Sequence, residues 1–258
     1  MSITFKKKPN YTVLADIYDR VMSDVDYETW ADYIDEIILE HRPEAENLLE
    51  LACGTGTIAL SLEELDCYKI TATDASEDMI RIAKNKALKV NSGIEFKTMN
   101  FLNLQLEKKF DVVYMVFDSI NYLHNEEDIL KLHKEIKKVL NPDGIFIYDF
   151  TTPRNSRKAI KFLNNEVKYV KNRFRYQRES SFDPVSKIHT NIFQIELKNG
   201  EDGNTVEKYE EKHQQKIYSQ SEIEALIKKT DFTILQAYDG FELKPAHQKS
   251  LRISMVLQ

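Results

Sequence analysis

The eight residues ELACGTGT at positions 50–57 decide the fold. They join an apolar run that begins at Asn47 to a stretch with helical periodicity, so Gly54 and Gly56 lie where a strand passes into a helix. Glycines at such a turn let bare backbone approach a ligand above the carboxyl end of a sheet. The stretch therefore predicts a ligand-binding crevice in an α/β domain.

Strand and helix patterns alternate around this stretch. We expect strands at 47–51, 69–73, 94–98, 110–117 and 145–150, and helices at 57–65, 77–88 and 126–140. Two helical segments, 11–22 and 30–39, come before the first strand, and strands at 232–238 and 251–257 end the chain. This alternation predicts a parallel sheet with helices on both faces.

The alternation breaks between residues 151 and 218. Segments with a period of two occur at 166–176, 186–198 and 205–218, and turn residues at 183–184 and 199–204 separate them. This pattern predicts an antiparallel sheet inserted after the fifth strand. We therefore expect a core formed by residues 1–150 and 219–258 and an antiparallel β insertion formed by residues 151–218.

Composition narrows the class of protein. The 258 residues carry a net charge of −6, which argues against nucleic-acid binding by broad phosphate neutralisation. No apolar run reaches the ~20 residues that a membrane helix needs, and no secretory signal is found, so we expect a cytoplasmic protein without membrane contact. Cys53 and Cys67 lack metal-ligand spacing, so we expect reduced thiols and no metal site.

One stretch, residues 154–178, is strongly basic. It holds nine Lys or Arg residues and a single acid, Glu166. Such a stretch suits an acidic substrate or RNA, but the acids of a facing strand (Glu207, Glu210 and Glu211) favour cross-strand charge pairing instead.

The strand after the glycine loop ends at Asp74, eighteen residues beyond Gly56. A carboxylate there can accept hydrogen bonds from both ribose hydroxyls of an adenosine. The pattern Gly54-x-Gly56-x-x-Ala59 also satisfies the relaxed dinucleotide fingerprint, so a nicotinamide-dependent oxidoreductase and a non-catalytic adenosine-binding module stay open. The helices before the first strand and the absence of a Tyr-x-x-x-Lys pair argue against the oxidoreductase.

Residues 50–56 and 73–79 together resemble a known family. ELACGTG looks like the first motif, and TDASEDM like the second, of the class I S-adenosylmethionine-dependent methyltransferases. The resemblance covers nearly the whole chain and implies S-adenosylmethionine as cofactor and a Rossmann-like, doubly wound sheet of seven strands, with 251–257 as the antiparallel seventh. It implies cofactor contacts at Leu51, Ala52, Gly54 and Gly56 (methionine and ribose end), Asp74 (ribose), Ala75 and Met79 (adenine), and Asn100 and Phe101, where the family often has an acid.

The N-terminal helices and the insertion extend the resemblance. Tyr18 and Trp30 look like the aromatic residues that close over the methionine part of the cofactor in small-molecule members. Core packing is an equal alternative, because aromatic stripes on helices usually pack. The sugar N,N-dimethyltransferases also carry a β insertion after strand five, and a likeness at that level implies shared architecture rather than a shared substrate.

The segment FDSINYL, residues 117–123, follows the fourth strand and faces the same crevice. We expect Phe117 to contact the cofactor, Asp118 and Tyr122 to orient the acceptor, and His213 of the insertion to act as a base. An exposed position on a polar strand is the favoured alternative for His213.

The acceptor is expected to be a small molecule that takes the methyl group by in-line displacement. No Asn-Pro-Pro-Tyr, Asp-Pro-Pro-Tyr or Pro-Cys string is present, which disfavours methylation of nucleic-acid bases. An RNA or protein acceptor bound by the basic insertion is the alternative. The insertion is also a candidate contact surface for a homodimer.

Overall fold

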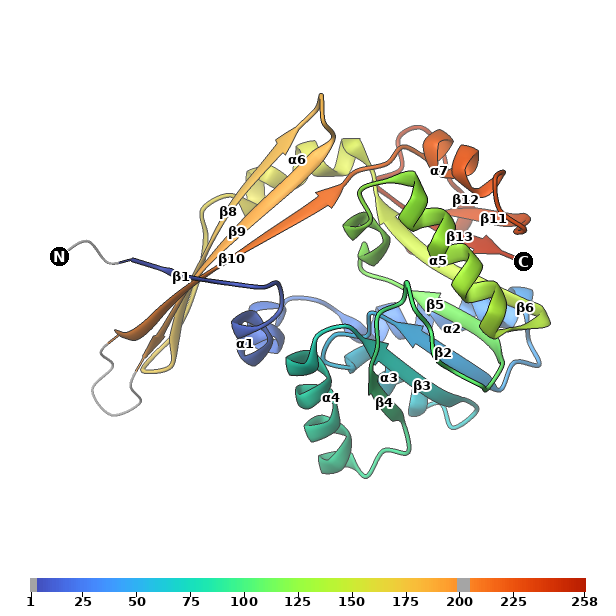
Figure 1. Ribbon diagram of the computed structural model, residues 1–258, viewed down its shortest axis with the longest axis horizontal. Helices are drawn as coiled ribbons and strands as arrows, with labels where there is room; N and C mark the ends of the chain where they lie inside the picture. The colour runs from blue at the N-terminus through green and yellow to red at the C-terminus, as the bar shows by residue number, and fades with distance from the viewer. Residues whose placement is uncertain (1–3, 199–204) are drawn as a thin grey trace.

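The computed structural model describes residues 4–198 and 205–258. An eight-stranded sheet forms its centre, with strand order β12-β11-β13-β6-β5-β2-β3-β4 (Figure 1). The strands are β2 (Asn47–Leu51), β3 (Lys69–Asp74), β4 (Glu95–Thr98), β5 (Phe110–Met115), β6 (Leu140–Thr151), β11 (Ile234–Asp239), β12 (Glu242–Pro245) and β13 (Arg252–Leu257). The strands from β4 to β6 are parallel, whereas β13 and β11 continue the sheet in antiparallel orientation.

Helices cover both faces of this sheet. Successive strand residues point to opposite faces, and here both faces are apolar. Val112 and Tyr114 of β5 belong to one apolar cluster, and Val113 and Met115 belong to another. The first cluster includes α2 (Tyr27–His41), α3 (Thr57–Glu63) and α4 (Glu77–Val90), and the second includes α5 (Glu126–Val139) and α7 (Gln220–Ile227). The predicted doubly wound α/β architecture is therefore confirmed.

All seven expected strands of the large sheet are present, and one further strand lies at its edge. β12 follows a turn at Gly240, whose φ is +65°, and it pairs with β11. Each of its four residues is exposed. The predicted count of seven is one too low, because an exposed edge strand carries no apolar alternation from which to recognise it.

A second sheet projects from the large one, with strand order β1-β10-β9-β8-β7 (Figure 1). Its strands are β1 (Lys6–Lys8), β7 (Glu166–Val170), β8 (Phe174–Asp183), β9 (Ile188–Lys198) and β10 (Thr205–Lys216). Strands β7 to β10 are antiparallel, whereas β1 pairs parallel with β10. The N-terminus thus contributes an edge strand to the sheet that the sequence assigned to residues 151–218.

Two details of this region differ from expectation. Residues 166–176 form a hairpin of β7 and β8 rather than one segment, and the helix α6 (Pro153–Leu163) precedes them. The start signals of α6 are in the sequence, since Thr152 accepts a hydrogen bond from the Asn155 amide and Pro153 occupies the first turn. The turn expected at 199–204 lies outside the described residues.

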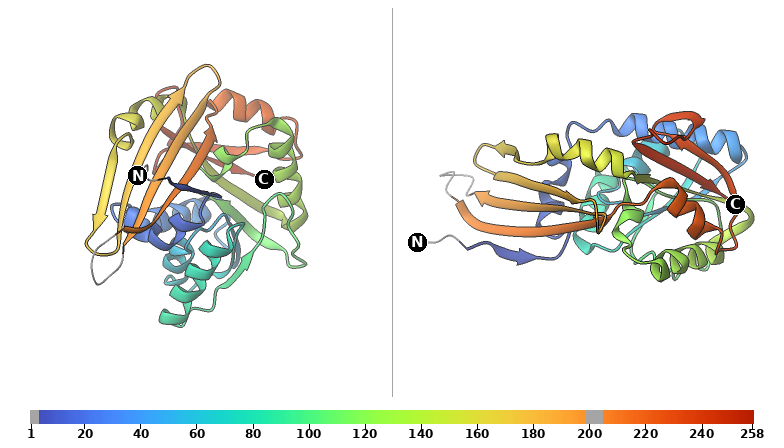
Figure 2. Two further views of the ribbon diagram at one scale, coloured as in Figure 1. Left: turned by 60° about the vertical axis from the view of Figure 1, so that its left-hand side comes forward. Right: turned by 90° about the horizontal axis from the view of Figure 1, so that it is seen from above.

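The helix α1 (Val13–Val21) packs against one face of the second sheet, which we call its inner face (Figure 2). The apolar side of the helix meets Phe174, Tyr176, Phe193, Ile195 and Tyr209 of that sheet. The polar side reaches α4, where Asp16 lies 2.7 Å from Arg81 and Asp19 lies 3.1 Å from Lys86. α1 therefore connects the second sheet to the core.

The charge partners expected for the basic stretch are wrong. Glu207, Glu210 and Glu211 lie on β10, and β9 separates that strand from β8. Arg178 instead pairs with Glu166 of β7 at 2.5 Å, and Lys168 pairs with Asp24 at 2.7 Å. The expectation passed over the segment 186–198, which as β9 lies between the basic strands and β10. Among the described residues, no helix has both the length and the apolarity needed to cross a membrane.

Candidate functional site

The glycine loop between β2 and α3 contains three residues with left-handed backbone. Ala52, Gly54 and Gly56 have φ values of +54°, +54° and +74°. A Cβ built on Gly56 would lie 2.6 Å from the Phe96 ring, whereas one built on Gly54 would meet nothing within 4 Å. Gly56 is therefore required by packing, and Gly54 keeps open the space above the loop.

Asp74 at the end of β3 holds this loop in place. Its carboxylate accepts hydrogen bonds from the Gly54 amide at 2.9 Å and from the Ser76 amide at 2.8 Å. Burial raises the pKa of Asp74 above its usual value, although the hydrogen bonds from Ser76 and Gly54 act in the opposite direction. The carboxylate is thus partly desolvated and sits at the edge of the open space.

A cavity of 320 Å³ lies above the carboxyl ends of β2 and β3. Eight of the residues that the sequence assigned to a cofactor line it: Tyr18, Ala52, Gly54, Asp74, Ala75, Met79, Phe101 and Phe117. Five further residues complete the lining: Asn10, Tyr11, Ser76, Ser119 and Tyr122. The structure therefore brings most of the assigned residues together around one space.

Four assigned residues do not line this cavity. Leu51 is wholly buried in the core, and Gly56 lies beneath the loop against Phe96. The side-chain oxygen of Asn100 accepts a hydrogen bond from the Leu102 amide at 2.8 Å. Trp30 lies one layer behind the cavity, where its ring stacks on Phe117 with the centroids 4.5 Å apart.

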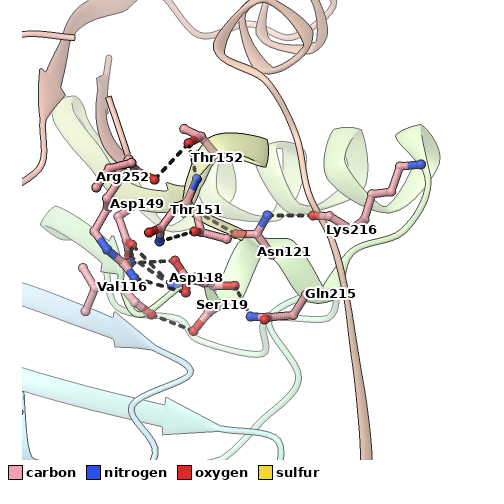
Figure 3. Close-up of polar contacts among 12 residues, drawn as sticks. Val116, Asp118, Ser119, Asn121, Asp149, Thr151, Thr152, Gln215, Lys216 and Arg252 are labelled. Atoms are coloured by element: carbon pink, nitrogen blue, oxygen red, sulfur yellow. Dashed lines mark hydrogen bonds and ion pairs between the residues drawn. The ribbon is translucent and has the colours of Figure 1, made fainter. Parts of the chain in front are cut away.

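The loop after β5 is strained and strongly held. Phe117 and Asp118 both have left-handed backbone, with φ of +61° and +59°, a conformation that costs of order 1–3 kcal/mol for each residue unless the surroundings impose it. The Asp118 amide donates to Asp149 at 3.3 Å, and Ser119 donates to the Val116 carbonyl at 2.7 Å (Figure 3). Asp149 is fully buried and also pairs with Arg252.

The side chain of Asp118 forms an ion pair with Arg252. Arg252 of β13 lies 2.6 Å from one Asp118 oxygen and bridges it to Asp149 (Figure 3). Asn121 extends the same network, because it donates to the Lys216 carbonyl at 2.7 Å and accepts from the Thr151 amide at 3.2 Å. The loop is therefore fixed to both the core and the end of β10.

A chain of hydrogen-bonding side chains leads from this loop into the second sheet. The Tyr122 hydroxyl lies 2.7 Å from the Tyr11 hydroxyl and 2.9 Å from His213 Nδ1. His213 Nε2 lies 3.2 Å from a carboxylate oxygen of Glu211. Burial raises the pKa of both tyrosines, so both hydroxyls are protonated near neutral pH.

The expectation of an exposed His213 is wrong, since its side chain is 2% exposed. It lies on the inner face of the second sheet and makes edge contacts with the rings of Tyr11 and Phe193. The strand reads as polar because Glu211 and His213 alternate with Lys212 and Gln214, so polarity alone does not mark which face is buried.

A second cavity of 140 Å³ separates α1 and this loop from the second sheet. Asp118, Tyr122 and His213, the three residues expected to act on an acceptor, all line it. Tyr11, Tyr18, Phe117 and Tyr122 line both cavities. The two spaces therefore adjoin across a shared aromatic wall.

Comparison with known proteins identifies the family. Residues 48–144 match the family of methyltransferase domains. The chain is 27% identical to the putative methyltransferase YqeM of Bacillus subtilis over 92% of its own length and 93% of that protein. It is also 27% identical to a crystal structure of an S-adenosylmethionine-dependent methyltransferase from Clostridium acetobutylicum, with a TM-score of 0.78 and coverage of 96% and 98%. The chain is a class I S-adenosylmethionine-dependent methyltransferase.

This family membership removes the oxidoreductase and the non-catalytic module from the alternatives, and the cofactor of the methyltransferase is S-adenosylmethionine. The fold extends to more distant proteins. The sugar N-methyltransferase KedS8 from Streptoalloteichus is 16% identical and has a TM-score of 0.72 over 93% of this chain and 91% of that one. A likeness at that identity concerns the fold.

The sequence did not point to several residues of the candidate site. Asn10 and Tyr11 precede α1 and line the larger cavity, but no periodicity marks a segment that crosses between two sheets. Ser76 caps α4 and also lines the cavity. Glu211 was assigned to surface charge pairing and is instead wholly buried behind His213.

Proposed function

We propose that the methyltransferase methylates a small molecule held in the 140 Å³ cavity beside the cofactor space. The observation that carries this proposal is that the two cavities adjoin at the same four aromatic residues. A group bound in the smaller cavity would therefore lie next to the cofactor. In this proposal, residues 1–150 and 219–258 hold the cofactor, and residues 151–218 shape the space for the acceptor.

The larger cavity has the chemistry that S-adenosylmethionine requires. The carboxylate of Asp74 can still accept hydrogen bonds from ribose hydroxyls, since an ionised carboxylate offers about four lone-pair sites and two backbone amides use only part of them. Gly54 lets the backbone approach the ligand, and Ala75, Met79 and Phe101 offer apolar surface for a base. We propose these residues as cofactor contacts, together with Tyr18 and Phe117.

When bound, S-adenosylmethionine supplies a methyl group already activated by its sulfonium. The residues of the protein then have to orient the acceptor, exclude water and accept a proton where the acceptor loses one. Tyr122 and His213 can do the last, because the acceptor proton can pass to the Tyr122 oxygen while the Tyr122 proton passes to His213 Nδ1, 2.9 Å away. Asp118 takes a positioning role through Arg252.

Asn191 favours an acceptor that carries hydrogen-bond donors. Its side chain is 8% exposed and lines the smaller cavity. Its amide oxygen has no hydrogen-bond partner among the described residues. A hydroxyl or amino group of a ligand would satisfy it. Hydroxylated amines fit this demand, and two of the proteins that share the fold are named as a sugar N-methyltransferase and an amino pentose methyltransferase.

The first experiment is calorimetric titration of S-adenosylhomocysteine into the wild type and the Asp74→Ala variant. Two lost hydrogen bonds to a charged group, at ~1.5 kcal/mol or more each, correspond to about a hundredfold loss of affinity. Glu77→Ala, an exposed acid on the next helix, is the control and should bind as the wild type does. Equal affinity of Asp74→Ala and the wild type would contradict the proposed cofactor placement.

The acceptor is tested by transfer of labelled methyl groups to small metabolites, RNA and protein in parallel. Label in a small metabolite supports the proposal, and label only in RNA or protein overturns it. On the acceptor found, His213→Asn should lower kcat by at least about a hundredfold while leaving S-adenosylhomocysteine affinity unchanged. His189→Asn is the matched control, since His189 is also a buried histidine of the second sheet but bonds Ser180.

A further inference from the structure

Glu211 is a wholly buried carboxylate that connects the two halves of the site. It lies on the inner face of β10, two residues before His213. One of its oxygens accepts from the Val13 amide at 2.7 Å and from the Leu14 amide at 2.9 Å. The other accepts from the Tyr11 amide at 2.7 Å and faces His213 Nε2 at 3.2 Å. Both oxygens are therefore saturated by donors.

Two of the three amides, those of Val13 and Leu14, begin α1, and the third belongs to Tyr11 just before the N-cap residue. The N-cap residue, Thr12, makes no side-chain capping hydrogen bond. The first four amides of a helix lack partners within the helix, and a negative charge beside them is favourable. Glu211 supplies both the acceptors and the charge, although about 200 residues separate it from the helix in sequence.

The same carboxylate sets the direction of the hydrogen-bond chain toward the acceptor cavity. An ionised carboxylate can only accept, so His213 Nε2 carries the proton and Nδ1 is left as an acceptor. Tyr122 then donates to His213 Nδ1, and its oxygen can accept from the Tyr11 hydroxyl or from the acceptor. This is the histidine tautomer that the proposed proton transfer needs.

We propose that Glu211 is a positioning residue that couples the two sites: it holds α1 over the cofactor and, with the same carboxylate, fixes the tautomer of His213 that faces the acceptor. The proposal rests on the proposed function in that it takes the larger cavity for the cofactor and the smaller one for the acceptor. Its geometry stands independently of either ligand.

Glutamine cannot replace Glu211 in this arrangement. In Glu211→Gln one oxygen becomes an amide nitrogen, which would point two N–H donors at two other donors. Depending on the side on which the nitrogen lies, the variant loses the pair Val13 and Leu14, or it loses Tyr11 and the proton of His213 Nε2. The first case removes the cap of α1, and the second releases the backbone of Tyr11, which lines the larger cavity.

The test compares Glu211→Gln with Glu210→Gln, a neighbour on the same strand whose side chain points to the opposite face. We expect Glu211→Gln to bind S-adenosylhomocysteine at least about tenfold more weakly than the wild type, and Glu210→Gln to bind unchanged. In nitrogen NMR spectra, wild-type His213 should show a protonated Nε2, and the amides of Tyr11, Val13 and Leu14 should be protected from exchange. Unchanged affinity and unchanged protection in Glu211→Gln would overturn the proposal.

Two further measurements, the wild-type spectra and the Asp74→Ala titration, make the outcome of this test interpretable. If Glu211→Gln does not fold, the wild-type spectra still decide, because a protonated His213 Nδ1 or unprotected amides at Tyr11, Val13 and Leu14 contradict the geometry. If Asp74→Ala binds S-adenosylhomocysteine as well as the wild type does, the cofactor placement fails while the His213 signals are unaffected. The failure of the inference and the failure of the proposed function are thus distinguishable.

Discussion

The larger cavity has two walls of different construction. One wall consists of the ends of β2 and β3, where Asp74 bonds the Gly54 amide across 20 positions in the chain. The other consists of α1 and its attachment to β10, where Glu211 bonds amides about 200 positions away. The first wall is formed by backbone and short-range contacts, and the second by side chains from distant segments. In the proposed function, the first wall binds the cofactor, and the second lies between the cofactor and the acceptor.

Alanine substitutions at the two glycines of the first wall should separate the effect of packing on stability from the effect of the loop on ligand binding. In Gly56→Ala the new Cβ meets the Phe96 ring at 2.6 Å in a left-handed backbone, which should lower the free energy of unfolding by about 2–5 kcal/mol. In Gly54→Ala only the left-handed strain applies, about 1–2 kcal/mol, but the methyl group enters the cavity and should weaken S-adenosylhomocysteine binding by about tenfold.

Urea unfolding of the ligand-free variants and calorimetric titration measure the two effects separately. Equal losses of stability in the two variants would mean that Gly54 is also required by packing, and the contrast between the glycines would disappear.

The first wall could be predicted from the sequence because its signals are contiguous. The strand from Asn47 to Leu51, the loop with Gly54 and the strand that ends at Asp74 each carry their own periodicity or turn chemistry, and parallel strands align their carboxyl ends. Their meeting point follows from topology alone. Eight of the twelve residues assigned to the cofactor accordingly line one cavity, and Trp30, Leu51, Gly56 and Asn100 lie beside or beneath it.

The second wall could not be predicted, since its contacts depend on strand neighbours that the sequence leaves undetermined. Glu211 and the basic stretch were matched as facing strands, but β9 lies between them. β1 joins the same sheet from the N-terminus, and three residues of a lysine-rich segment give no strand signal. The buried position of His213 is not evident from the sequence either, because both faces of its strand are polar.

The first wall should also respond to pH through Glu50. Burial raises the pKa of this carboxyl from 4.5 to about 8, while the Tyr114 hydroxyl, 3.2 Å away, acts in the opposite direction. The folded state therefore keeps a proton that the unfolded state releases, so the Glu50 contribution to stability is present below pH 4.5 and is lost as pH rises toward 8.

Unfolding free energies across that range, for the wild type and Glu50→Gln, measure this contribution. The wild type should lose up to about 1.4 kcal/mol per pH unit relative to the variant. The exposed Glu28→Gln should track the wild type. A difference between the wild type and Glu50→Gln that stays constant with pH would show that Glu50 does not bind a proton on folding.

The smallest effect is expected at Trp30, which lies behind the wall that the two cavities share. Its ring stacks on Phe117 and lies 5.2 Å from the Arg252 guanidinium, but it does not line either cavity. Trp30→Phe keeps an aromatic ring behind Phe117, so S-adenosylhomocysteine affinity should change by less than about threefold, or ~0.7 kcal/mol. Phe117→Ala removes ligand-facing surface and should weaken binding by about tenfold.

Calorimetric titration of both variants tests this order. A larger loss for Trp30→Phe than for Phe117→Ala would mean that the indole reaches the ligand in the bound state, as the resemblance to lid residues implied. In that case α2 would join α1 as part of the second wall, and the division between the two walls would run behind Phe117 rather than in front of it.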